Sequence, residues 1–190
     1  APVKEAVLSE QLGISRAPIR EALQVLVQEG LITSEPQKGK HVRQMTGKEI
    51  YDSYVVAGIL EGAGVAESLP LWTEANMETF RSVVRQMEGK ISYATKLDEL
   101  AEIDELFHAT LFMACDNTRL VEMARTSCAT ISKYLYYQHW ITMFTPREYA
   151  DRHHAVAEAV YSRDVKHVET ALRDHYKETG LRMAQFGKEA

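Results

Sequence analysis

The chain has 190 residues, of which 45% are hydrophobic and 26% charged, and its 22 Lys and Arg against 27 Asp and Glu give a formal net charge of −5. This composition predicts a globular protein with a core and excludes a collagen-like or low-complexity chain. No stretch approaches the roughly 20 uninterrupted apolar residues of a membrane span, and the first ten residues lack the apolar core of a secretory signal, so we expect a cytoplasmic protein without membrane contact.

The acidity lies in the second part of the chain. Residues 1–45 carry six basic and five acidic side chains, which leaves a net charge of −6 on residues 46–190. The basic residues of the first segment are grouped at 16–20 and 38–43. An acidic total argues against nucleic-acid binding, because phosphates attract basic surfaces, but this distribution permits a small DNA-binding segment.

The first segment predicts two short helices followed by a hairpin. Residues 3–12 have apolar side chains at helical spacing, and Gly13 is typical of the residue that ends a helix. Residues 16–29 predict a second helix, which Ser15 is placed to cap. Residues 31–35 alternate between apolar and polar side chains, as a short strand does. Residues 36–40 predict a turn, and residues 41–43 can return as the paired strand.

Basic side chains stand at two points of this arrangement. Arg16 and Arg20 are four residues apart on the polar face of the second helix, where they suit the major groove of DNA. Lys38, Gly39 and Lys40 form the tip of the hairpin and can approach a phosphate backbone. This order of helix, tight turn, arginine-bearing helix and basic hairpin is typical of a winged helix-turn-helix.

The segment LSEQLGISRAPIREALQVLVQEGLITSEPQKGKHV resembles the DNA-binding domain of the GntR family of bacterial transcription regulators. The resemblance implies that Ser15, Arg16 and Arg20 contact operator DNA from the recognition helix, and that Lys38 and Gly39 contact it from the wing tip. It also implies a homodimer on a palindromic operator. The family places another helix before this segment, so the winged domain is incomplete at its start and we expect the sequence to be part of a longer one.

A second domain is predicted to follow directly. Thr46-Gly47-Lys48-Glu49 has the form of a helix capping box, which divides the chain into a winged domain at 1–46 and a second domain at 47–190. Six helices without strands are predicted there, at residues 49–69, 73–91, 98–115, 118–142, 146–162 and 164–186. The fold is therefore expected to be mainly α, with an all-α antiparallel helical bundle after the winged domain.

Four polar side chains fall on the inward faces of these helices. Asp104 and His108 are four residues apart on one face. His153, rather than His154, leads into an apolar stripe, and His175 lies on the apolar side of the last helix. Three imidazoles and one carboxylate suit one divalent metal per chain, with zinc preferred and nickel or manganese possible. Without thiolate ligands, the site suits a sensor or an enzyme better than a structural zinc.

The second domain resembles the FCD type of C-terminal domain, found in the FadR subfamily of GntR regulators. The residues that carry this resemblance are Asp104, Phe107, His108, Asn117, His153, Ala159, Asp164 and His175. It implies that Asp104, His108, His153 and His175 bind a divalent metal, and that a small carboxylate effector binds the metal in the same cavity. The implied function is a DNA-binding transcription regulator, most commonly a repressor, and not an enzyme.

One position departs from that pattern. Many relatives have an arginine four residues before the glutamate that matches Glu61, and here that position is Ala57. If the arginine holds the effector carboxylate in those relatives, this chain uses another group or recognises another compound. The identity of the effector stays open.

Two other functions remain compatible with the residues alone. A metal-dependent hydrolase or lyase with an N-terminal interaction module would activate water at open metal positions, but Glu102 and Glu105 do not follow a metallohydrolase spacing. The other function is a metal-free regulator that binds acyl chains. In it the inward aspartate and three histidines would line an apolar pocket, which costs free energy because buried polar groups lose their hydration. The aromatic stretch at 134–140 favours core and dimer contacts over a pocket wall.

Overall fold

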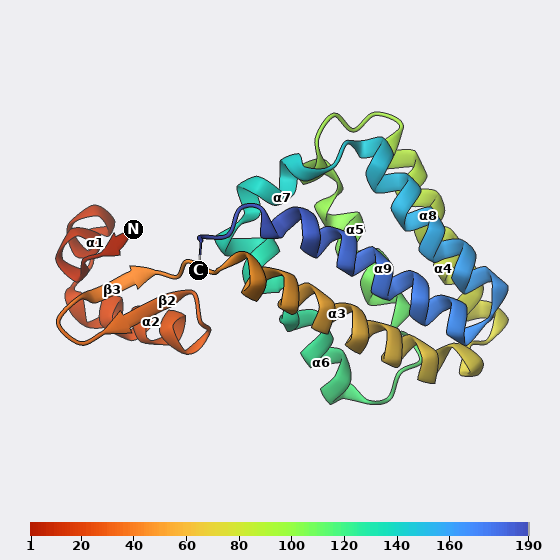
Figure 1. Ribbon diagram of the computed structural model, residues 1–190, viewed down its shortest axis with the longest axis horizontal. Coiled ribbons are helices and arrows are strands. Elements are labelled where there is room, and N and C mark those ends of the chain that lie inside the picture. Colours follow the sequence, from red (N-terminus) through yellow and green to blue (C-terminus); the bar gives the residue numbers. More distant parts are fainter. Residues whose placement is uncertain (190) are drawn as a thin grey trace.

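A small N-terminal unit of two helices and a sheet is followed by a larger body made of helices (Figure 1). The computed structural model describes residues 1–189, and within them the only sheet has three strands in the order β1-β3-β2. The N-terminal elements are β1 (Pro2–Val3), α1 (Glu5–Leu12), α2 (Arg16–Gln28), β2 (Ile32–Glu35) and β3 (Gly39–Val42). This arrangement is the winged helix-turn-helix that the sequence predicts.

The first two residues of the predicted helix at 3–12 are not helical. Val3 pairs with Lys40 of the hairpin in an antiparallel ladder, and α1 begins only at Glu5. Two residues are too few to give a periodic signal, so the sequence could not separate this short strand from the helix. The other end agrees with the prediction, because Gly13 ends α1 in the left-handed conformation at φ 65°.

The helical body contains seven α-helices within the described residues. They are α3 (Gly47–Ser68), α4 (Glu74–Ile91), α5 (Ala101–Leu111), α6 (Thr118–Ser127), α7 (Tyr137–Met143), α8 (Pro146–Ser162) and α9 (Val165–Ala184), with 3-10 turns η1 (Leu69–Leu71) and η2 (Leu97–Leu100) and a π-helical stretch η3 (Thr130–Leu135). The predicted capping box is present, since Thr46 and Glu49 exchange side-chain and backbone hydrogen bonds at the start of α3.

The single long helix predicted at 118–142 is divided into α6, η3 and α7. The backbone leaves the helical region at Tyr136, with φ −124° and ψ 21°. Apolar and aromatic side chains recur at helical spacing through the whole stretch, so its periodicity does not reveal the break. The break matters for the site, because π-helical insertions are frequent at functional sites and η3 forms one wall of the cavities described below.

Two glycines let α3 and α9 lie against each other along much of their length (Figure 1). A Cβ atom at Gly58 would lie 2.9 Å from the Cβ of Tyr176, and one at Gly180 would lie 2.8 Å from the Cβ of Tyr54. Larger residues at either position would force the helices apart. This close approach places Tyr54 and Glu61 of α3 beside the side chains of α9 that face the site.

By length and composition alone, the helical segment Gly47–Leu71 could span a membrane, with a mean hydropathy of 1.2. Half of that window is buried inside the structure, where α3 packs on α9 and α6. Core helices of globular domains meet the same criterion, so the segment is only weak evidence for a membrane span.

Candidate metal centre and adjoining cavities

Three imidazoles from three helices converge inside the helical body. His108 comes from α5, His153 from α8 and His175 from α9, and one ligand-type nitrogen of each lies within 4.8 Å of the others. Asp104, one turn before His108, adds a carboxylate whose Oδ1 is 3.1 Å from Nε2 of His153 and 4.0 Å from Nε2 of His108. The structure thus brings together the four residues that the sequence predicts as metal ligands.

Hydrogen bonds at the opposite ring nitrogens point Nε2 of two histidines toward this centre. Nδ1 of His153 lies 2.8 Å from the backbone carbonyl of Tyr149, to which it can donate. Nδ1 of His108 lies 2.7 Å from Oε1 of Glu61, to which it can likewise donate. A histidine that donates from one nitrogen to a carbonyl or carboxylate keeps the lone pair of the other nitrogen for a metal.

Unpaired nitrogens are the observation that favours a metal here. Nδ1 of His175 is buried without a hydrogen-bond partner among the described residues, and Nε2 of His153 faces only the carboxylate of Asp104, itself a predicted ligand. Burial lowers the pKa of both imidazoles, and the nearby positive charge of Arg152 lowers that of His175 further, to well below its ordinary value. Both rings are therefore neutral, which is the form that binds a metal ion. The donor set of three nitrogens and one carboxylate oxygen fits zinc.

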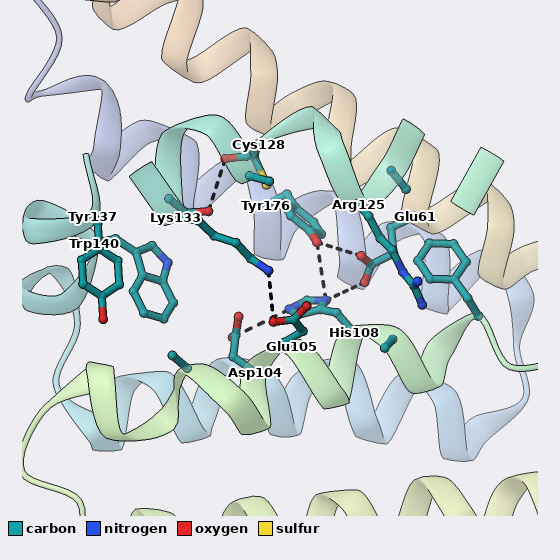
Figure 2. Close-up of a pocket in the computed structure, with 16 residues that line it drawn as sticks. Glu61, Asp104, Glu105, His108, Arg125, Cys128, Lys133, Tyr137, Trp140 and Tyr176 are labelled. Atoms are coloured by element: carbon teal, nitrogen blue, oxygen red, sulfur yellow. Dashed lines mark hydrogen bonds and ion pairs between the residues drawn. The ribbon is translucent and has the colours of Figure 1, made fainter. Parts of the chain in front are cut away.

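Glu61 is a site residue that periodicity alone does not assign. Its carboxylate is buried on α3, accepts from Nδ1 of His108 and accepts a 2.7 Å hydrogen bond from the hydroxyl of Tyr176 (Figure 2). Burial opposes a charge on His108, but the carboxylates of Glu61 and Asp104 outweigh it and raise the pKa of His108 to about 9. In the metal-free protein, a proton on His108 thus balances these carboxylates.

The neighbouring histidine lies outside the cluster. The side chain of His154 is 39% exposed and its Nε2 lies 3.2 Å from Glu88 of α4. His153, by contrast, is 1% exposed and lies at the centre. The apolar stripe that follows His153, and not His154, at helical spacing therefore distinguishes the two orientations on α8.

Two adjoining cavities meet at these residues. The smaller, about 80 Å³, is lined by all four predicted ligands together with Arg152. The larger, about 250 Å³, shares Asp104 and His108 with it and extends between α5 and the α6–η3 wall (Figure 2). The larger cavity is mostly apolar, and its lining includes Ala101, Ala109, Phe112, Ala124, Ala129 and Trp140. A small ligand could therefore enter the larger cavity and reach the metal ligands.

The aromatic stretch divides between several roles. Tyr137 and Trp140 line the larger cavity, whereas Tyr134 is 64% exposed. Tyr136 contacts the linker between β3 and α3, which comprises residues 43–46. Its hydroxyl accepts from the backbone N–H of Met45 at 3.0 Å and donates to the carbonyl of Met45 at 3.2 Å. Core contact, the favoured interpretation, holds for Tyr136, while two members of the stretch form a pocket wall.

The predicted DNA-contacting residues lie on the surface of the N-terminal unit. Ser15 and Arg16 are exposed at the start of α2. The side chain of Arg20 is 66% exposed and lies 3.3 Å from Glu5, and that of Lys38, at the hairpin tip, lies 2.8 Å from Glu35. Exposed ion pairs of this kind contribute little to stability and can exchange for phosphate contacts.

Gly39 lies at the same hairpin tip with φ 80°, a conformation that favours glycine. It leaves open space where a side chain would stand, because no atom lies within 4 Å of the position of a Cβ. A backbone of this kind can approach a phosphate closely.

Comparison with known proteins identifies both parts of the chain. The FCD domain profile matches residues 52–178, and the profile of bacterial regulatory proteins of the gntR family matches residues 2–42. The HTH-type transcriptional repressor RspR of Escherichia coli strain K12 is 26% identical over 191 residues, which cover 99% of this chain and 82% of the relative. The Nta operon transcriptional regulator of Aminobacter aminovorans is 28% identical over 153 residues, covering 80% of this chain and 69% of the relative.

A solved structure shares the whole arrangement. The E. coli protein McbR/YncC superposes with a TM-score of 0.73 at 19% identity, over 98% of this chain and 88% of the other. At this identity the likeness shows the fold, a winged helix-turn-helix followed by a helical domain.

Proposed function

Because the chain belongs to the gntR family of bacterial regulatory proteins and carries an FCD domain, we propose that a small organic acid, held at a divalent metal, controls its binding to operator DNA. The chain is a DNA-binding transcription regulator with a ligand-sensing domain, and the family consists of regulators and not enzymes. A metal-dependent hydrolase is therefore not favoured. The observation that supports the metal is the convergence of Asp104 with His108, His153 and His175 on one point.

Zinc is the metal we propose first, with nickel and manganese compatible with the same donors. Four protein ligands carry one negative charge, so a bound divalent ion would supply residual positive charge and room for an anionic ligand. Glu61 would hold the ring of His108 in place through Nδ1, and the carbonyl of Tyr149 would do the same for His153. A carboxylate effector suits that charge.

For the DNA contacts we propose Ser15, Arg16 and Arg20 on α2, with Lys38 and Gly39 at the tip of the hairpin. The winged domain would occupy residues 1–46 and the effector domain residues 47–190. A homodimer would present two copies of α2 to a palindromic operator, and repression in the cytoplasm would follow the relative named a repressor.

The signal would pass through η3. One side of this stretch lines the cavities with Ser132 and Lys133, and Tyr136 at its end holds both backbone groups of Met45 in the linker. Met45 is 4% exposed and packs with Ile131 of η3. A ligand that moves η3 would therefore change the placement of the winged domain, by as much as its affinities for the two arrangements differ.

The test compares operator binding by the protein with and without bound zinc. An operator is selected from random-sequence DNA with the full chain, and its Kd is measured for zinc-loaded and chelator-stripped protein with and without a panel of organic acids. We expect at least one acid to change the Kd in the zinc-loaded protein only. Acid effects that persist unchanged after stripping would contradict a metal-held effector.

A further inference from the structure

The smaller cavity gathers most of the unpaired polar atoms of the interior. Within residues 1–189, six buried side-chain nitrogen or oxygen atoms make no hydrogen bond of good geometry. Four of them belong to residues that line this cavity, namely Tyr54, Tyr149, His153 and His175. A metal would satisfy the two histidine nitrogens but would leave the hydroxyls of Tyr54 and Tyr149. Tyr54 has Ser132 beside it and Tyr149 has Asp104, but neither hydroxyl makes a hydrogen bond of good geometry, so both can donate to a second occupant of the cavity.

A buried cation faces the same space. The side chain of Arg152 is 12% exposed, and its Nε donates to Glu178 at 2.9 Å. Its Nη2 donates to Thr179 at 2.7 Å and to a backbone carbonyl, and the guanidinium lies 4.0 Å from the centre of the Phe144 ring. The hydrogen bonds that Arg152 donates come from Nε and Nη2, which leaves Nη1 for another acceptor. Arg152 is therefore a fixed cation with donors left for an anion.

The two adjoining cavities suit different parts of one ligand, a small charged group and a larger apolar body. The smaller cavity, about 80 Å³, has room for a metal ion and two or three oxygen atoms, because a water molecule takes roughly 30 Å³. The larger cavity, about 250 Å³, begins at the shared wall of Asp104 and His108 and is lined by alanines and Phe112. Although Glu61, Arg125 and Lys133 also line it, most of its wall is apolar, so an apolar group gains free energy by entering it.

Charged groups at the mouth of the larger cavity are mostly paired. Lys133 lies 3.0 Å from Glu105, and both side chains are more than half exposed (Figure 2). Arg125 also reaches the cavity, from an exposed position on α6. A second carboxylate on the ligand would thus have to reach this rim to find a cation.

We propose that the effector is a monocarboxylic acid with an apolar body. Its carboxylate lies in the smaller cavity, where it accepts from Arg152 and from the hydroxyl of Tyr54 beside the metal, and its body fills the larger cavity. This inference rests on the function proposed above and adds the class of ligand and the residues that select it. It gives Nη1 of Arg152 and the hydroxyl of Tyr54 a well-placed acceptor.

Calorimetric titration of the zinc-loaded full chain with benzoate, hexanoate and succinate tests this. Tyr54→Phe removes a hydroxyl that makes no hydrogen bond of good geometry to the protein, so we expect the fold to be kept and acid affinity to fall about tenfold. Arg152→Gln removes a charge-assisted bond, and we expect a loss of about 100-fold. Tyr161→Phe, partly buried on α8 and outside both of these cavities, serves as the control and should match wild type. Elemental analysis of each variant shows whether zinc is retained.

The outcomes are distinguishable. Tighter binding of benzoate or hexanoate than of succinate, weakened in Tyr54→Phe with zinc retained, supports the proposal. Wild-type affinity in both Tyr54→Phe and Arg152→Gln overturns the position of the carboxylate. Preference for succinate, lost in Arg125→Gln, overturns the apolar body, and binding of none of the three acids overturns the proposal. A wild-type chain that takes up no zinc contradicts the proposed function itself.

Discussion

The hydroxyl of Tyr136 is hydrogen-bonded to both backbone groups of Met45, a residue 91 positions earlier in the linker between the two domains. One side chain thus fixes the entry to α3, while the stretch that carries it lines the larger cavity. This contact connects the wall of the larger cavity to the segment that leads into the winged domain.

Tyr136→Phe is expected to reduce this coupling. The ring still packs on Met45, so operator affinity without effector should change by no more than about twofold, while the change in operator affinity on adding effector should become smaller. Fluorescence anisotropy of labelled operator, with and without a binding acid, measures both. Tyr134→Phe, on an exposed side chain of η3, is the matched control. An unchanged effector response in Tyr136→Phe would exclude this route.

Glu61→Gln is expected to weaken metal binding by about 10- to 100-fold, since outer carboxylates orient and polarise a ligating histidine. The amide can still accept from His108 but lacks the negative charge. Zinc affinity in competition with a chromophoric chelator gives the measurement. Glu67→Gln, exposed on the same helix, should bind zinc as wild type does. Equal affinities in the two variants would remove Glu61 from the site.

Zinc uptake is expected to release one proton per chain near pH 8. The carboxylates of Glu61 and Asp104 raise the pKa of His108 from 6.5 to about 9, so this ring is charged there, whereas His153 and His175 are already neutral. Because the folded pKa is the higher one, the charge on His108 stabilises the metal-free fold below about pH 6.5, and this contribution is lost as pH rises through about 9.

Calorimetry of zinc binding in two buffers with different ionisation heats counts the protons. Measurements at about pH 8 and again above about pH 10 should show the release decline as His108 becomes neutral in the free protein. No release at the lower pH would contradict the charged state of His108.

Arg20→Ala is expected to weaken operator binding and to reduce the slope of log K against log salt by roughly 0.9, if the guanidinium contacts one phosphate. Binding is measured at several salt concentrations on the selected operator. Arg147→Ala removes the same charge from an exposed position on α8 and should leave the slope unchanged. Identical slopes in the two variants would contradict the assignment of α2 as the recognition helix.

The sequence predicted those features that depend on local chemistry. Gly13 and the Thr46–Glu49 capping box end and begin helices through contacts within a few residues, and the spacing of Asp104 and His108 fixes a shared face. It missed features set by distant partners. Periodicity does not assign Glu61 or Arg152 to the site, and only the packing of α3 and α8 on other helices shows what they contact.

The break at η3 could not be predicted for a related reason. The stretch around Ile131 and Tyr136 packs both on the linker and on the body, so its apolar residues do not fall on a single helical face. The pattern of apolar residues therefore does not reveal the change of helical phase.

Elemental analysis of the purified full chain tests the metal centre most directly. The account predicts about one equivalent of divalent metal, with zinc first, in the wild-type protein, and a loss of most of it in His108→Ala and in His175→Ala. His154→Ala, one residue away from the centre on α8, should keep the wild-type content. Full metal occupancy in both His108→Ala and His175→Ala would contradict the central claim.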